Sequence, residues 1–249
     1  MEVLGEAVAW LTDPASWNGP NGVGVRLLEQ VVLSAVSLGV ALAVALPAGL
    51  VIGHTGRGAA AVIWVANIGR AVPSLGWIGI FFPIVLALRT GESGFWTCVI
   101  ALTLLAIPPI VTNTYTGLRG VDGDMIEAGR GMGMREGQLL RRVEVPLALP
   151  VILAGIRISA TQTVATATLA AVVSGGTLGV IIIQGINGGR DDRLVGASLV
   201  VVALTLATEA LFALLERLAG GRRSTPRARG GFESAAELAP PGGGAPGPV

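Results

Sequence analysis

Long apolar runs separated by short polar stretches dominate the pattern along this chain. Three of these runs contain no charged residue: residues 31–52, 93–118 and 158–189. A helix needs about 20 apolar residues to cross the hydrocarbon core of a bilayer, and each run is long enough. The pattern therefore predicts an all-α integral membrane protein.

We expect five core transmembrane helices. Four of the regions are simple and lie at about residues 27–52, 93–115, 147–173 and 194–215. The remaining region, 59–88, would be about 45 Å long as a straight helix. It contains Arg70 and Pro73 and is either one bent span with an interfacial lead-in or two short spans. The total is therefore five spans, or six.

Composition agrees with a membrane protein and limits the chemistry of the chain. Only 13% of the residues are charged, against about 25% in soluble domains. Every basic residue is arginine. Without lysine there is neither a Walker A phosphate loop nor a Schiff-base amine. The single cysteine, Cys98, allows no disulfide framework. We expect a chain that is not itself an enzyme.

The arginines also predict the orientation of the chain. With five spans and the N-terminus outside, most loop arginines fall on the inner side, as the positive-inside rule requires. Residues 1–26 would then be an extracytoplasmic segment and residues 27–219 the transmembrane domain. Residues 220–249, rich in Gly and Pro, would be a disordered cytoplasmic tail. Two short spans in the second region would instead move the N-terminus inside.

A charged, glycine-containing loop at about residues 117–146 interrupts the apolar pattern on the inner side. Asp124 and Glu127 have capping-box spacing, which predicts a short helix capped by Asp124. Gly133 suits a left-handed end to this helix. A second helix, about 134–144, should end before Pro146. Such helices could rest at the membrane interface, but their mixture of charges favours docking to a soluble cytoplasmic partner.

Six residues in and after this loop resemble the EAA loop of bacterial ATP-binding cassette importer permeases. They are Glu127, Ala128, Gly129, Gly133, Leu149 and Pro150. The chain departs from the family pattern at Gly129, where alanine is usual and glycine should loosen the helix by about 1 kcal/mol. The resemblance implies the type I importer permease fold, with the loop in a groove of an ATPase subunit.

A narrower resemblance covers most of the chain, about residues 27–218. Residues 152–179 are similar to permeases for glycine betaine, choline, carnitine, proline betaine and related quaternary amines. Methionine and other amino-acid importers share much of this pattern and are the alternative. Outside this family, an ion-gradient-driven secondary transporter is a rival. A purely structural membrane protein is another, and the loop makes it the least attractive reading.

The resemblance also implies partners and a location. This chain would be half of the pore, completed by a second copy or a related permease. A cassette ATPase would bind ATP and Mg²⁺ on the cytoplasmic side, with no cofactor on this chain, and an extracytoplasmic solute-binding protein would deliver the solute. We expect a multi-pass protein of the bacterial inner membrane with a cytoplasmic C-terminus and no nucleic-acid partner.

Several residues within the spans are candidates for function. Hydroxyls and an amide of the fourth predicted span could line a polar pathway or join helices by hydrogen bonds. They are Thr161, Gln162, Thr163, Thr166 and Thr168, with Ser174 further along. Three glycines could form a hinge or permit close packing. They are Gly175, Gly176 and Gly179.

Ionisable residues inside a membrane are functional candidates by default, although they also pair for structural reasons. Here they are Arg70, Arg157 and Glu209. We expect Arg157 and Glu209 to form an ion pair because their predicted depths are similar. A single imidazole makes no metal site, so His54 is expected to be a polar loop residue. The few aromatic residues indicate no cage for a quaternary ammonium group.

Overall fold

The computed structural model describes residues 2–58, 64, 72–89, 91–173 and 175–220, with side chains to residue 218. All regular elements in these ranges are helical, which confirms the expected all-α fold. They are α1 (Glu2–Thr12), α2 (Pro14–Trp17), α3 (Val23–Thr55), α5 (Ser74–Ala87), α6 (Ser93–Arg119), α7 (Gly123–Gly131), α8 (Glu136–Leu139), the π-helical turn η1 (Leu140–Glu144), α9 (Val145–Thr166), the 3-10 segment η2 (Ala167–Val173), α10 (Gly179–Gly188) and α11 (Asp191–Gly220).

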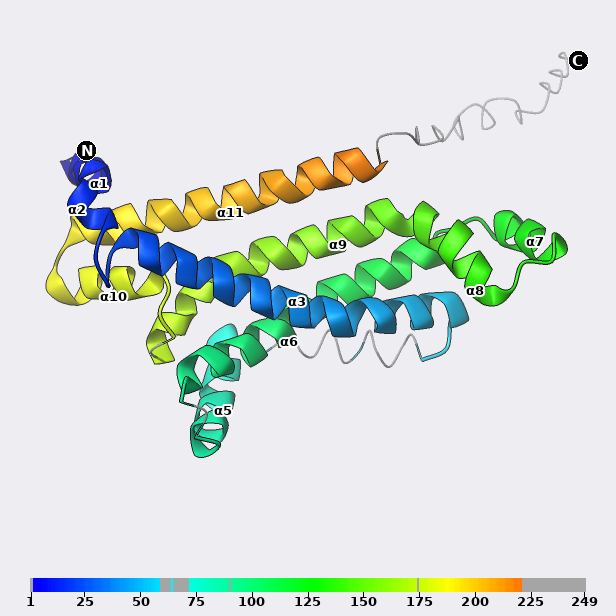
Figure 1. Cartoon of the computed structure of the whole chain (residues 1–249), viewed down its shortest axis with the longest axis horizontal. Helices are drawn as coiled ribbons and strands as arrows, with labels where there is room; N and C mark the ends of the chain where they lie inside the picture. Colours follow the sequence, from blue (N-terminus) through cyan, green and yellow to red (C-terminus); the bar gives the residue numbers. More distant parts are fainter. Residues whose placement is uncertain (1, 59–63, 65–71, 90, 174, 221–249) are drawn as a thin grey trace, which may run out of the picture.

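Four helical stretches in the described part of the chain are long and apolar enough to cross a membrane. They are Val23–Thr55, Ser93–Arg119, Glu136–Val173 and Asp191–Leu218. Each contains one of the four simple spans that the hydrophobic pattern predicts. They form an elongated bundle, with α5 and the short α10 near one end (Figure 1).

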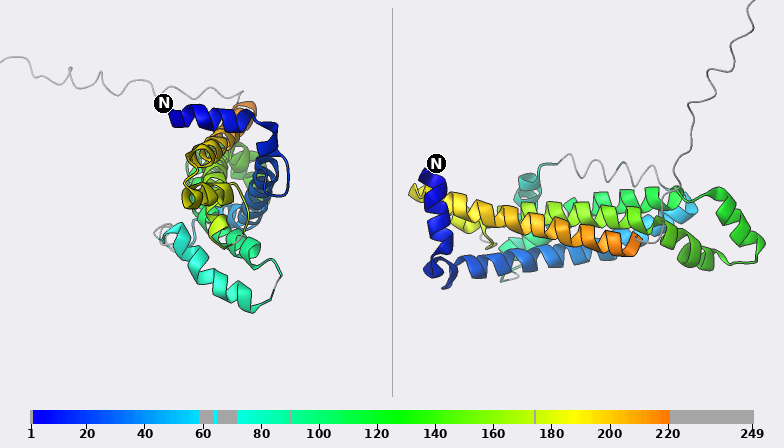
Figure 2. Two further views of the ribbon diagram at one scale, coloured as in Figure 1. Left: turned by 90° about the vertical axis from the view of Figure 1, so that its left-hand side faces the viewer. Right: turned by 90° about the horizontal axis from the view of Figure 1, so that it is seen from above.

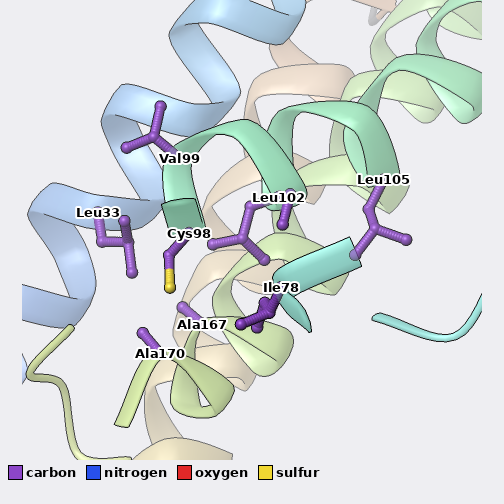
Figure 3. Packing of buried hydrophobic residues seen from close by; sticks show 9 residues of the cluster. Leu33, Ile78, Cys98, Val99, Leu102, Leu105, Ala167 and Ala170 are labelled. Atoms are coloured by element: carbon purple, nitrogen blue, oxygen red, sulfur yellow. The ribbon is translucent and has the colours of Figure 1, made fainter. Parts of the chain in front are cut away.

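The core begins where three of the long helices meet. Leu33 of α3 packs against Cys98 and Leu102 of α6, and against Ala167 and Ala170 of η2 (Figure 3). All five side chains are at most 2% exposed. Small residues on η2 let it approach the larger leucines closely, as is usual between membrane helices.

A second cluster, at the other end of α3, fixes the direction of the helices. There Leu50 packs with Leu118 of α6 and Ala148 of α9. Along α3 and α6 the residue numbers rise together from the Leu33 cluster to this one, so the two helices are parallel. Along α9 the numbers fall, so α9 is antiparallel.

The remaining long helix, α11, runs in the same direction as α3. Near its start Ala197 packs with Val23, the first residue of α3. Farther along, Glu209 and Glu216 reach Arg157 of α9. The described part of the bundle therefore has three parallel long helices and one that runs the opposite way.

These directions bear on the number of spans. Thr55 and Ser93 lie at opposite ends of the bundle, because α3 and α6 are parallel. One crossing between them agrees with this arrangement, whereas two crossings would return the chain to its starting side. The arrangement therefore favours five spans. Residues 59–63 and 65–71, with Arg70, lie outside the described residues, as does the tail from residue 221.

Candidate functional site

The loop that the sequence singles out forms a helical hairpin at one end of the bundle. We define the α7–α8 hairpin as residues 123–144, which comprise α7, α8 and η1. It connects α6 to α9 and projects beyond the end of α3 (Figure 1). The helices α1, α2 and α10 lie at the far end, which Figure 2 shows from two further directions. The hairpin and the N-terminal segment thus occupy opposite ends of the molecule.

The first helix of the hairpin is capped by Asp122 and not by Asp124. Asp122 is extended, with ψ of 128°, and its Oδ1 accepts a hydrogen bond from the backbone N–H of Asp124 at 3.0 Å. The prediction of Asp124 as the cap is wrong because α7 begins at Gly123, two residues earlier than expected. Asp124 lies in the first turn, where a negative charge favours the helix dipole.

Gly133 ends α7 as predicted. Its φ is +79°, in the left-handed region. The N–H of Gly133 donates to the carbonyl of Arg130 at 2.9 Å, and the N–H of Met134 donates to the carbonyl of Gly129 at 3.1 Å. These two bonds make a Schellman motif, which satisfies carbonyls that the end of the helix leaves free.

The second helix does not end before Pro146, so that prediction is wrong. α8 passes through η1 directly into α9. In η1 the N–H of Val145 donates to the carbonyl of Leu140, five residues back. This wider turn accommodates a proline that would otherwise collide with the carbonyl four residues before it. The second arm of the hairpin is therefore continuous with α9, which lies in a membrane-spanning stretch.

Packing between α7 and α8 explains the departure at Gly129. Gly129 is buried, and a Cβ added to it would lie 2.7 Å from Cδ1 of Leu139. Leu139 itself is fully buried. A glycine here lets α7 cross close to α8. The close packing of α7 against α8 thus offsets the lower helix propensity of glycine at position 129.

The other residues of the EAA-like pattern are spread over two regions. Glu127 and Ala128 are exposed on α7, where a partner could contact them. Leu149 is partly buried and Pro150 exposed, and both lie in α9 beyond η1. The structure thus brings Glu127 and Ala128 together on the outer side of the hairpin and leaves the Leu149–Pro150 pair at the base.

An ion pair joins the two arms of the hairpin. Arg130 of α7 donates from Nε to Oε1 of Glu136 at 2.9 Å and from Nη2 to Oε2 at 3.2 Å. This hydrogen bonding raises the pKa of Arg130 above its ordinary value. Both side chains are more than half exposed, so the pair orients the arms more than it stabilises the fold.

His54 is a residue of this region that sequence reasoning missed. It lies in the last turn of α3 and not in a loop. Its Nδ1 is 2.7 Å from Oε2 of Glu144, and its Nε2 is 3.3 Å from Oε2 of Glu136. Glu144 is 90 residues away along the chain, so no local pattern could reveal the contact.

The polar residues of α9 do not share one face. Thr161 donates to Oε2 of Glu209 at 2.9 Å, Gln162 is exposed, and Thr163 is buried. Successive residues point about 100° apart around a helix with 3.6 residues per turn. Thr166 and Thr168 are partly buried beyond them, and Ser174 lies outside the described residues. Lining of a solute pathway by this set stays a prediction.

The expected ion pair between Arg157 and Glu209 is confirmed. Nε of Arg157 lies 3.4 Å from Oε1 of Glu209, and its Nη1 lies 3.1 Å from Oε2 of Glu216. One arginine of α9 therefore faces two carboxylates of α11. The three side chains are 28–44% exposed, and together they hold α11 against α9.

The three candidate hinge glycines are in tight surroundings. Gly176 has φ of +76°, and an added Cβ would lie 2.5 Å from Oε2 of Glu29. A Cβ added to Gly175 would lie 2.9 Å from Ala170. A Cβ added to Gly179 would overlap the carbonyl oxygen of Thr168. Close packing gives each glycine a structural reason, and a hinge stays a prediction.

The segment between η2 and α10, which contains Gly175 and Gly176 and which we call the glycine-rich loop, is hydrogen-bonded to residues near the start of α3. Oε2 of Glu29 accepts from the N–H of Thr177 at 2.9 Å. Oε1 of the fully buried Gln30 accepts from the N–H of Leu178 at 3.2 Å, and its Nε2 donates to the carbonyl of Val164 at 3.0 Å. Two adjacent side chains of α3 thus hold this loop by its backbone.

Long apolar helices with a polar helical hairpin at one end define an integral membrane protein. The chain belongs to the family described as the binding-protein-dependent transport system inner membrane component, which matches residues 45–220. It is therefore a transport component of a membrane. Permeases of ABC importers work together with an ATPase and a substrate-binding protein.

Characterised relatives cover most of the chain. The carnitine transport permease protein OpuCB of Listeria monocytogenes is 40% identical over 79% of this chain and 84% of its own length. The choline transport system permease protein OpuBB of Bacillus subtilis (strain 168) is 35% identical over 77% and 86%. The osmoprotectant import permease protein OsmW of Salmonella typhimurium is 33% identical over 74% and 85%.

A solved structure confirms the fold. The inward-facing MetNI methionine ABC transporter matches with a TM-score of 0.69 at 24% identity, over 77% of this chain and 93% of that one. At this identity the likeness shows the fold alone. The type I ABC importer permease fold that the sequence resemblance implied is therefore confirmed.

Proposed function

We propose that this chain forms half of the translocation pathway of an ATP-driven importer for quaternary amine osmoprotectants. The solutes would be glycine betaine, choline, carnitine or proline betaine. Choline and carnitine appear in the names of relatives that are 35% and 40% identical. The chain would supply the membrane path and the mechanical coupling, while a partner hydrolyses ATP.

The observation that carries the proposal is the α7–α8 hairpin. It presents Glu127 and Ala128 to solvent, and its second arm continues into α9 without a break. A cassette ATPase that grips α7 would thereby act directly on a membrane helix. Closure of two ATPase subunits on ATP and Mg²⁺ would move two such hairpins and open the path outward, and hydrolysis would reset it.

The opposite end of the bundle suits the docking of a solute-binding protein. There α1, α2, α10 and the start of α11 line an open polar cavity of about 500 Å³. Its lining includes Asp13, Asn21, Gln184, Arg190 and Arg193. With the hairpin in the cytoplasm this cavity would face outward, and the end of α11 would lie on the cytoplasmic side. A second copy or a related permease would complete the pathway.

Selectivity would come mainly from the solute-binding protein. The described residues contain two aromatic pairs, and each pair lies within a single helix: Trp77 with Phe81 in α5, and Phe95 with Trp96 in α6. A cation–π cage for a quaternary ammonium group needs several rings that converge on one point. The pathway would then pass solutes that the receptor has already selected.

Charge reversal on the hairpin tests the proposal. We expect Glu127→Arg to abolish co-purification of the cassette ATPase in mild detergent and ATP-dependent uptake in vesicles. Glu92→Arg is the matched control, because Glu92 is an exposed acid at the opposite end of the bundle, and it should keep the ATPase. Normal ATPase binding and uptake by Glu127→Arg would refute the role of the hairpin.

Two rival functions are separated by uptake assays. A methionine-like permease would show competition by methionine and not by glycine betaine or choline. An ion-gradient-driven transporter would work without an ATPase, and it would need a carboxylate that can exchange a proton or sodium ion. The candidate Glu209 is instead engaged with Arg157 and Thr161, which favours the ATP-driven importer.

A further inference from the structure

His54 joins α3 to the second arm of the α7–α8 hairpin, which comprises α8 and η1. Its two ring nitrogens face Glu144 in η1, at 2.7 Å, and Glu136 in α8, at 3.3 Å. Glu136 in turn pairs with Arg130 of α7. A continuous series of polar contacts therefore runs from the end of α3 through α8 to α7, the helix that carries Glu127.

The π-helical turn is what places the two glutamates on the same side of their helix. Glu136 and Glu144 are eight residues apart. An α turn holds 3.6 residues and a π turn about one more, so one turn of each kind holds about eight. The two carboxylates are therefore stacked one above the other. A regular α-helix would instead place Glu144 about 80° around the helix from Glu136.

Burial makes the contact between His54 and Glu144 energetically important. The side chain of Glu144 is 5% exposed and that of His54 is 15% exposed. A buried carboxylate without a partner is strongly unfavourable. Among the described residues His54 is the only side chain within hydrogen-bond or ion-pair distance of the Glu144 carboxylate. Separation of α3 from the hairpin would leave this charge unpaired.

The other end of α3 is bonded to the glycine-rich loop. There Glu29 and Gln30 bind the backbone N–H groups of Thr177 and Leu178. α3 has 33 residues, which corresponds to a length of about 50 Å. One helix is therefore bonded at its inner end to the hairpin and at its outer end to the loop that contains Gly175 and Gly176 and leads into α10 at Gly179.

We propose that His54 is a positioning residue of the transport cycle. By holding Glu144 and Glu136 it fixes the hairpin to α3, so that a displacement of the hairpin by the ATPase also moves α3 and the loop at its outer end. This inference rests on the proposed function. It assigns His54 no contact with solute or nucleotide. Its loss uncouples ATP hydrolysis from import and leaves the ATPase bound.

The test uses the complete transporter in proteoliposomes and measures solute imported per ATP hydrolysed. His54→Leu removes both contacts and should lower this ratio about tenfold. The free energy of one hydrogen bond to a charged group corresponds to about this factor in an equilibrium constant. His54→Asn places a donor where Nδ1 lies and should restore most of the ratio. Thr55→Ala is the matched control, because in the described part of the chain the hydroxyl of exposed Thr55 bonds only to Val51 and Arg57, at its own end of α3. It should match the wild type.

A double variant separates positioning from stability. His54→Leu with Glu144→Leu removes both partners and leaves no unpaired buried charge, so it should fold. It still lacks the link, and we expect the same loss of ratio with the ATPase bound. An unchanged ratio in either leucine variant, or a loss in Thr55→Ala of equal size, would overturn the proposal. Rescue by His54→Asn would support it.

Failure of this inference differs visibly from failure of the proposed function. If the wild-type complex imports solute without ATP, or never binds the ATPase, the proposed function is wrong. If the wild-type complex couples normally and His54→Leu does too, only the positioning role of His54 is wrong.

Discussion

Replacing Gly176 with alanine tests how tightly the glycine-rich loop is held to α3. Gly176 has φ of +76°, and an added Cβ would lie 2.5 Å from Oε2 of Glu29. The new side chain must displace this carboxylate. Glu29 would then lose the 2.9 Å hydrogen bond that it accepts from the N–H of Thr177. The substitution therefore combines backbone strain with the loss of the hydrogen bond that joins the loop to Glu29 of α3.

The two contributions can be estimated separately. A left-handed backbone costs a residue with a Cβ about 1–2 kcal/mol. A hydrogen bond to a charged group contributes about 1.5 kcal/mol at the low end of its range, and the low end applies because the Glu29 side chain is 38% exposed. Gly176→Ala should thus lower the free energy of unfolding by about 2.5–3.5 kcal/mol.

Gly189→Ala is the matched control. Gly189 has φ of +62°, also left-handed, but an added Cβ meets no atom within 4 Å. This variant should show the backbone strain alone, about 1–2 kcal/mol. The difference between the two variants then isolates the contact with Glu29. In a Glu29→Ala background that difference should disappear, since the displaced group is gone.

The single cysteine supplies the assay. Cys98 is 1% exposed in the cluster that also contains Ala167 and Ala170. A thiol-reactive fluorogenic dye added to the purified protein in detergent therefore reports unfolding of this core. The midpoint should be about 3–6 °C lower in Gly176→Ala than in Gly189→Ala. Equal midpoints, or a difference that persists without Glu29, would refute the reasoning.

Two further predictions concern the hairpin and the α9–α11 contact. Gly131→Ala should slow amide exchange in α7 more than Gly129→Ala does, because a Cβ at Gly131 meets nothing within 4 Å. At Gly129 the gain in helix propensity of about 1 kcal/mol is offset by the 2.7 Å contact of the new Cβ with Leu139. Equal slowing would show that Leu139 does not oppose a Cβ at Gly129. Arg157→Gln and Glu209→Gln should each cost about 1 kcal/mol of stability in dye-detected unfolding. The double variant should cost less than their sum, and strict additivity would mean that the pair is not coupled.

The membrane spans could be predicted because their signal is local. Apolar length alone selects a helix in a bilayer, where each backbone polar group must be satisfied within its own segment. Each of the four long described helices contains one of the predicted spans. The left-handed Gly133 was equally readable, since glycine is the residue that accepts positive φ at a helix end without steric cost.

The wrong predictions for the hairpin concern positions where two local conformations are both compatible with the residue types. Asp122 and Asp124 are both acceptable caps, and only the point where the chain leaves α6 decides between them. Pro146 stops a regular helix, but a π turn lets the helix continue. Neither choice is encoded by residue type alone. The number of spans in region 59–88 was similarly open until the parallel packing of α3 and α6 favoured one crossing.

By itself the sequence determined the membrane class, the position of the polar loop that forms the α7–α8 hairpin and, through the EAA-like residues, the family. It could do so because apolar length and short motifs act over a few turns of chain. Only the tertiary structure decided that His54 binds Glu144, that Glu29 and Gln30 hold the glycine-rich loop, and that Thr161, Gln162 and Thr163 point in different directions. These contacts depend on which helix faces are brought together over 90 residues or more, and that choice is made by packing across the whole bundle.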